Sequence, residues 1–169
     1  MPANASVDGV PAEAYPIPPW QPRGEVRLVS LGLANVQLQG VGGAATRVLR
    51  VRLIVTNAGG AVPWIIDTRA IVLSLSGVDR SLAAYAKADA GVPPVVQIAP
   101  GQRGTVDLYY PLPAAVRDPE QVPAFYVEWQ IQTGRGVVGQ RTPFRRVEPP
   151  QVPPSTHFIY GGYYSYPSD

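Results

Sequence analysis

The sequence has 169 residues, of which 46% are hydrophobic and only 15% charged, so it can form one domain with a sizeable core and appendages. The formal net charge is +2 and the basic residues are arginines except for Lys87, which is not the dense basic patch of a nucleic-acid-binding module, so we expect no nucleic-acid partner. Because cysteine is absent, the composition excludes disulfides, thiol nucleophiles and cysteine-ligated zinc.

Residues 1–24 predict an extended, proline-rich linker. They carry six prolines, and the stretch AYPIPPWQP is typical of polyproline II. Trp20 is an exception in such a linker, and we expect its ring to pack back onto the domain rather than form an exposed anchor. Residues 1–6 lack the basic and apolar regions of a signal peptide. Two interpretations remain: a cytosolic protein, or a protein whose signal peptide has been removed. The proline-rich start favours the second.

From Glu25 onward the hydrophobic period changes to two residues, which predicts β-strands. Residues 25–39 show a shift of parity between Gly32 and Asn35, where we expect a bulge or a strand switch. Residues 46–57 alternate more cleanly, which predicts one dry and one wet face, as in an antiparallel sheet. The dry face holds Leu49, Val51, Leu53 and Val55, and the other holds Val48, Arg50, Arg52 and Thr56.

The middle of the chain continues this pattern. Residues 68–77 predict a strand that ends at Gly77, with Ile71, Leu73 and Leu75 on one face. Residues 80–91 are the only stretch that fits a helix, and they could equally hold a short edge strand. Residues 95–112 predict two strands joined at Pro100 and Gly101, which suit the central positions of a type II turn. This corner lacks the residue spacing of a phosphate-binding loop.

The most regular predicted strand is FYVEWQIQ, residues 125–132, with alternate residues directed inward. These inward residues are Phe125, Val127, Trp129 and Ile131. Residues 134–136 predict a turn, and the chain returns as a last strand up to residue 147. Pro143 has no amide hydrogen for a ladder, so we expect this strand at a sheet edge.

The predicted fold is all-β, an immunoglobulin-like antiparallel β-sandwich of about seven to nine strands over residues 25–147, with proline-rich N-terminal and Pro/Tyr/Gly-rich C-terminal extensions. Strands and turn signals every 8–12 residues are typical of a sandwich, and the missing helix–strand alternation disfavours a parallel α/β sheet. We expect six side chains in the core: Trp129, Phe125, Leu53, Val55, Leu108 and Leu73.

Residues 148–169 form a second low-complexity end with four tyrosines, Tyr160, Tyr163, Tyr164 and Tyr166. Disorder is the simpler interpretation. The alternative is docking, since tyrosines on a glycine-rich backbone offer contact area and an extended peptide can add to a sheet edge. Self-association or an envelope partner through this tail is the corresponding hypothesis.

The order of VRLIVTNAGG, IVLSLSG, IAPGQRGTVDLYYPLP and FYVEWQI resembles bacterial immunoglobulin-like domains of cell-envelope lipoproteins and secreted proteins. The shared features are a strand ending at Asn57, the Pro-Gly corner, and a strand ending at Leu112 and Pro113. The resemblance covers about residues 25–147. It implies the fold and a periplasmic, outer-membrane-anchored or extracellular location, and it implies no catalytic residue.

Catalytic and metal sites are not predicted. His157, the only histidine, lies in the tail, where a catalytic site could not hold it rigidly. The acidic residues lack the spacing of a calcium loop or a carboxylate pair across a cleft. No stretch approaches the ~18 apolar residues of a membrane helix. We therefore expect no enzyme activity, no metal, no cofactor and no transmembrane segment.

Two binding hypotheses remain. The first is a non-enzymatic envelope or extracellular module that docks other proteins through its sheet edge and its extensions. The second is a carbohydrate- or anionic-polymer-binding module that uses exposed tyrosines with Arg50 and Arg52, although a solvated sheet face is the simpler interpretation of these arginines. Exposed aromatics clustered on one face would favour the second hypothesis. Aromatics confined to the core and the tail would favour the first.

Overall fold

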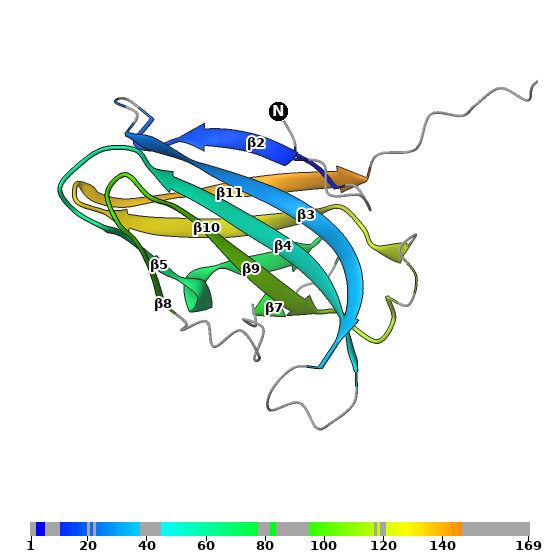
Figure 1. Cartoon of the computed structure of the whole chain (residues 1–169). Coiled ribbons are helices and arrows are strands. Elements are labelled where there is room, and N and C mark those ends of the chain that lie inside the picture. Colours follow the sequence, from blue (N-terminus) through cyan, green and yellow to red (C-terminus); the bar gives the residue numbers. More distant parts are fainter. Residues whose placement is uncertain are drawn as a thin grey trace, which may run out of the picture.

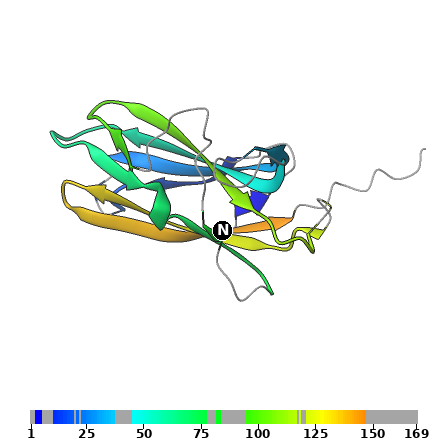
Figure 2. The same cartoon turned by 90° about the horizontal axis from the view of Figure 1, so that it is seen from below.

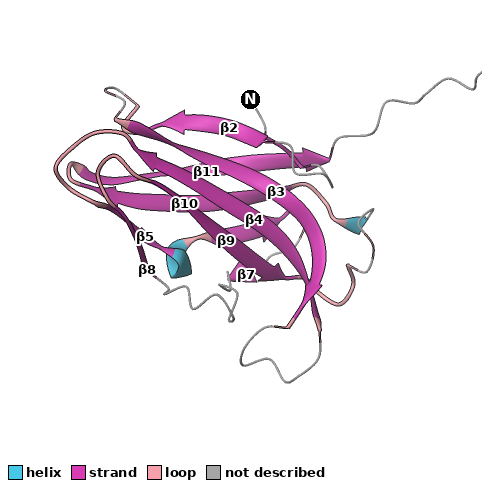
Figure 3. Cartoon of the chain, viewed as in Figure 1, coloured by secondary structure: helices cyan, strands magenta, loops and turns pink. Residues whose placement is uncertain are grey.

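The computed structural model describes residues 3–5, 11–19, 21, 23–37, 45–77, 82–83, 95–116, 118 and 121–146. Within these ranges the chain forms eleven strands and one short 3-10 helix, arranged as two sheets. Figure 2 shows the two sheets edge-on as separate layers, and Figure 3 shows how completely strands dominate the chain. The predicted all-β sandwich is confirmed.

The smaller sheet has four antiparallel strands in the order β2-β3-β4-β9. Their bounds are β2 Pro11–Pro16, β3 Gly24–Val36, β4 Thr46–Asn57 and β9 Arg103–Pro111. β3 and β4 are the long strands that cross the front of Figure 1. Alternating burial along β4 shows why these residues form a strand: every second side chain enters the core.

The larger sheet has the order β1-β11-β10-β5-β8, with β6 paired to β10 and β7 paired to β6. Its strands are β1 Ala3–Ala5, β5 Trp64–Asp67, β6 Val72–Leu75, β7 Leu82–Ala83, β8 Val95–Ile98, β10 Phe125–Thr133 and β11 Gly136–Arg146. The 3-10 helix Thr68–Ala70 separates β5 from β6. The pairing is antiparallel except that β1 runs parallel to β11. Neighbours β4 and β9 in one sheet, and β11, β10 and β5 in the other, follow the immunoglobulin-like order.

The core lies between the inner faces of the two sheets. All six predicted core residues are buried, with exposed fractions between 0% and 2%. The ring of Phe125 stacks on Phe144 at 4.7 Å between centroids. Trp129 donates from Nε1 to the hydroxyl oxygen of Thr142 at 2.9 Å, so its polar atom is satisfied inside the core.

The prediction of a linker over residues 1–24 is wrong in the part of that segment that the structure describes. β2 pairs with β3, β1 pairs with β11, and Ile17 is 1% exposed within the core. The ring of Tyr15 lies 5.4 Å from that of Trp129. The proline content of this segment predicted a linker, although prolines are also tolerated on an edge strand, where one side of the backbone needs no partner. Trp20 lies outside the described residues.

The structure tests three local predictions, namely the irregularity in β3, the Pro-Gly turn and the segment over residues 80–91. The register of β3 against β4 shifts between Ser30 and Gly32, so the irregularity is a bulge rather than a strand switch, and it lies just before the predicted stretch Gly32–Asn35. At the Pro-Gly corner the amide of Gln102 donates to the carbonyl of Ala99 at 3.0 Å, and Gly101 has φ 76°, as a type II turn requires. Residues 82–83 form a short strand, and the remainder of the helix prediction over 80–91 lies outside the described residues.

The edge prediction for the last strand needs a partial correction. β1 pairs with β11 at Phe144, Arg145 and Arg146, so that end of the strand is covered. The rest of β11 has β10 as its only strand partner among the described residues. The parallel pairing of β1 could not be predicted because three residues carry too little periodicity.

Candidate functional site

The arginines singled out in the sequence lie on the outer face of the smaller sheet. Arg52 forms a bidentate pair with Asp107 of β9, at 2.6 and 2.8 Å, and this hydrogen bonding raises the pKa of Arg52. Arg50 donates from Nη2 to the carbonyl oxygen of Leu31 at 3.0 Å. Both side chains therefore connect neighbouring strands of their own sheet. The sequence could not show this, because the register that brings Asp107 opposite Arg52 is a tertiary property.

The four tail tyrosines, Tyr160, Tyr163, Tyr164 and Tyr166, lie outside the described residues. Among the described aromatic side chains, six are buried: Trp64, Tyr109, Tyr110, Phe125, Trp129 and Phe144. Tyr15 and Tyr126 are partly exposed, and the guanidinium carbon of Arg141 covers the Tyr126 ring at 4.1 Å. The described surface thus has no cluster of exposed aromatic rings.

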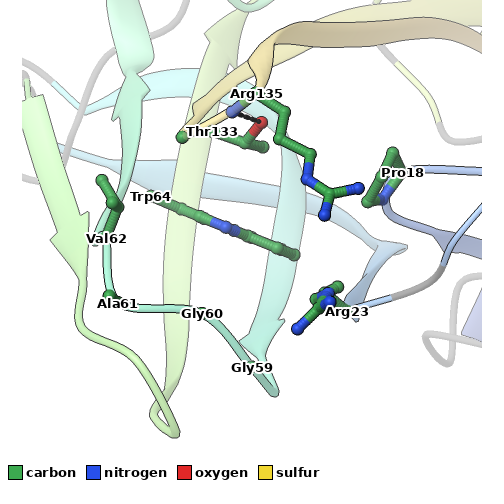
Figure 4. Close-up of a pocket in the computed structure, with 10 residues that line it drawn as sticks. Pro18, Arg23, Gly59, Gly60, Ala61, Val62, Trp64, Thr133 and Arg135 are labelled. Carbon is green, nitrogen blue, oxygen red and sulfur yellow. Dashed lines mark hydrogen bonds between the residues drawn. The ribbon is translucent and has the colours of Figure 1, made fainter.

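A pocket of about 260 Å³ opens at one end of the sandwich (Figure 4). Its described lining comes from three loops, the first residue of β5 and the last residue of β10. These residues are Pro18, Arg23, Gly59, Gly60, Ala61, Val62, Trp64, Thr133, Gly134 and Arg135. Sequence reasoning missed this site because the residues come from three separate segments of the chain, within residues 18–23, 59–64 and 133–135.

Backbone contacts fix the two arginines of this pocket. The amide of Arg23 donates to the carbonyl of Ile17 at 2.7 Å, and its carbonyl accepts from Ala58 at 2.8 Å. Arg135 lies in the turn between β10 and β11, where its amide donates to the hydroxyl of Thr133 at 3.2 Å. Both guanidinium groups extend toward the same end of the Trp64 indole in Figure 4.

The strand-end asparagine holds the loop that forms one wall of the pocket. Asn57 is fully buried, and its Nδ2 donates to the carbonyl oxygens of Val62 at 3.2 Å and Ile98 at 3.1 Å. Its main chain pairs with the Pro-Gly corner through Gly101 and Gln102. Asn57 therefore sets both the loop over residues 58–63 and the corner that follows β8.

The second candidate surface is the uncovered edge of β11 over residues 136–142. The amide of Ser76 donates to the carbonyl of Ala124, so even-numbered residues of β10 face β6, and odd-numbered ones face β11. Through the register, the odd-numbered residues of β11 direct their backbone groups away from β10. Pro143 has this parity, as expected of a residue without an amide hydrogen. Among the described residues, the amides and carbonyls of Val137, Gly139 and Arg141 therefore have no strand partner at this edge.

No group of three or more histidine, aspartate or glutamate side chains lies close enough to hold a metal ion within the described ranges. In the same part of the chain, no helix has the length and hydropathy to span a membrane.

The sequence matches no protein-family model and no curated protein. Among solved structures, the yjhA protein from Bacillus subtilis resembles it with a TM-score of 0.50 and 11% identity, over 78% of this chain and 96% of that chain. A second structural-genomics target, SoR45, gives a TM-score of 0.39 and 12% identity, over 83% of this chain and 96% of that chain. At these identities the likeness to the yjhA protein establishes the two-sheet all-β fold alone.

Proposed function

We propose that this chain is a non-enzymatic module of the cell envelope or extracellular space that assembles with protein chains through the open edge of β11. The main observation behind this proposal is that the backbone groups of Val137, Gly139 and Arg141 have no strand partner within the described part of the chain. Strand addition on such an edge is a recurrent mode of protein recognition. The β1–β11 pairing supports the proposal, since the same edge already accepts a short strand at Phe144–Arg146. The location rests on the resemblance of residues 25–147.

The occupant we propose is a second copy of this chain, paired antiparallel about a two-fold axis at Gly139. The open stretch over residues 136–142 is symmetric about this glycine, so Val137 of one copy meets Arg141 of the other. Each directly opposed pair of odd-numbered residues across this interface exchanges two backbone hydrogen bonds. In this register Arg141 of one copy does not lie opposite Arg141 of the other, so like charges are not opposed. At the axis Gly139 lies opposite Gly139, so no side chains are opposed there. Val137, which is 65% exposed, gains cover against the Arg141 stem.

Hydrogen exchange followed by NMR at increasing protein concentration tests this proposal. We expect the amides of Val137, Gly139 and Arg141 to exchange fast in dilute protein and to become protected as concentration rises to millimolar. Val138, Gln140 and Thr142 donate toward β10 and should be protected throughout. Because a single strand pair buries little area, the expected dimer is weak, in the micromolar-to-millimolar range.

Val137→Pro removes one edge amide and inserts a ring, so it should abolish dimerisation in sedimentation equilibrium. Val137→Thr keeps the amide and the branched side chain and should dimerise as the original protein does. A dimer that survives Val137→Pro, or a chain that stays monomeric at millimolar concentration, would exclude β11 self-pairing. Loss of dimerisation only when residues 148–169 are removed would assign assembly to the tail instead.

The alternative, a carbohydrate- or anionic-polymer-binding module, has less support on the described surface. Stacking on sugar rings needs exposed aromatic faces. The described tryptophans, Trp64 and Trp129, are 4% and 2% exposed, and Arg50 and Arg52 already hydrogen bond within their sheet.

A further inference from the structure

We propose that the pocket at Trp64 binds a carboxylate attached to an apolar group, such as the C-terminal carboxylate of a peptide whose last side chain is apolar. This site is separate from the β11 edge and does not depend on it. The inference rests on the charge, the lining and the size of the pocket.

The described lining of the pocket is positively charged. Arg23 and Arg135 line it, and no carboxylate is among its described lining residues. Arg135 donates from Nη1 to the amide oxygen of Gln21 at 2.6 Å, which orients the guanidinium group without neutralising it. The side chain of Arg23 has no hydrogen bond or ion pair within the described part of the chain. Two guanidinium groups that converge without a carboxylate form a site for an anion.

Four arginines outside the pocket pair with acids. Four ion pairs show this pattern: Arg27 with Glu25 at 3.0 Å, Arg52 with Asp107 at 2.6 Å, Arg69 with Asp67 at 2.8 Å and Arg141 with Glu128 at 3.5 Å. Arg23 and Arg135 have no such carboxylate partner among the described residues that line the pocket.

The walls of the pocket are apolar. Pro18, Ala61, Val62 and Trp64 contribute them, and Val62 is 51% exposed. Gly134 approaches this wall closely, since a Cβ at that position would lie 3.2 Å from the Cβ of Val62. An apolar group seated here would cover Val62 while its carboxylate meets the arginines (Figure 4).

Size and exposure indicate the class of ligand. Ligand pockets for drug-sized molecules start at ~300 Å³, so a site of about 260 Å³ suits one side chain with its carboxylate rather than an oligosaccharide. Trp64 is only 4% exposed and offers no free face for stacking a sugar ring. A peptide terminus or a free acyl amino acid fits these limits.

NMR titration with N-acetyl-leucine tests the site, because it carries both an apolar side chain and a free carboxylate. We expect saturable shifts of the amides of Gly59–Val62 and Thr133–Arg135. N-acetyl-leucine amide lacks the charge, so its affinity should be lower by at least about ten-fold, as expected for the loss of a hydrogen bond to a charged group. Acetate lacks the apolar part and should also bind more weakly.

Arg23→Gln combined with Arg135→Gln should reduce the affinity for N-acetyl-leucine about ten-fold or more. Arg103→Gln combined with Arg145→Gln also removes two positive charges, from exposed arginines that do not line the pocket, and should leave the affinity unchanged, which controls for net charge. A peptide ending in leucine with a free carboxylate separates the two sources of ligand. Tighter binding than N-acetyl-leucine identifies a polypeptide terminus, and equal binding identifies a small free acid. Equal binding of acid and amide, or full affinity in the double variant, would overturn the proposal.

Discussion

Tyr110 shows how a single buried polar group affects the stability of this sandwich. Its ring is fully buried on β9, and its hydroxyl donates to the carbonyl oxygen of Ile71 at 3.3 Å. Burial disfavours the phenolate and raises the pKa of Tyr110 above that of free tyrosine. The hydroxyl is therefore protonated in the folded state at pH values where the unfolded chain loses its proton.

The consequence is a loss of stability at alkaline pH. Above the ordinary tyrosine pKa near 10 the folded state binds one proton more than the unfolded state, so the free energy of unfolding falls as pH rises, by up to about 1.4 kcal/mol per pH unit for this group. Below that pH the contribution is fully present. Tyr110→Phe removes this term, and its unfolding free energy should fall less steeply between about pH 10 and 11 in urea denaturation.

At neutral pH, the free energy of unfolding of Tyr110→Phe should differ from that of the original protein by an amount that does not depend on pH. The lost hydrogen bond to Ile71 is expected to lower the free energy of unfolding by about 0.5–1.5 kcal/mol. Parallel pH profiles of the two proteins above pH 10 would contradict the assignment to Tyr110.

Among the elements, β2 carries the largest difference between the sequence prediction and the structure. The segment AYPIPP has the composition of a linker, yet it adds an edge strand to β3 and places Ile17 in the core. The chain then returns to β3 through hydrogen bonds between Ile17 and Gly24, at 2.9 Å, and between Arg23 and Ile17, at 2.7 Å. Residues 11–17 therefore belong to the sandwich.

Ile17→Ala tests the role of β2. We expect a loss of about 2–5 kcal/mol in the free energy of unfolding, because the substitution leaves a cavity among the core side chains. Val137→Ala, at a site 65% exposed, should change stability by less than about 0.5 kcal/mol and serves as the control. A small effect of Ile17→Ala would mean that residues 1–24 behave as the linker that their composition suggests.

At the scale of the whole molecule, one core cluster joins both sheets, and its buried residues run from Ile17 to Phe144. The C-terminal segment, residues 148–169, follows the last strand. We predict that deleting it leaves the melting temperature nearly unchanged, because the prolines at 149, 150, 153 and 154 interrupt any ladder before Tyr160 is reached. Differential scanning calorimetry of the truncated chain measures this. Unfolding of the truncated protein would show that the tail contributes to the core.

The sequence by itself determined the sandwich, since an alternation of period two identifies strands and the side that each turns to the core. Trp129, Phe125 and Leu53 illustrate this, as does the type II turn at Gly101, because a turn depends on neighbouring residues only. The tertiary structure alone decided which distant residues meet. The pairing of Arg52 with Asp107, the edge left open on β11 and the convergence of Arg23 with Arg135 at Trp64 depend on register and loop placement, and local sequence patterns do not encode these.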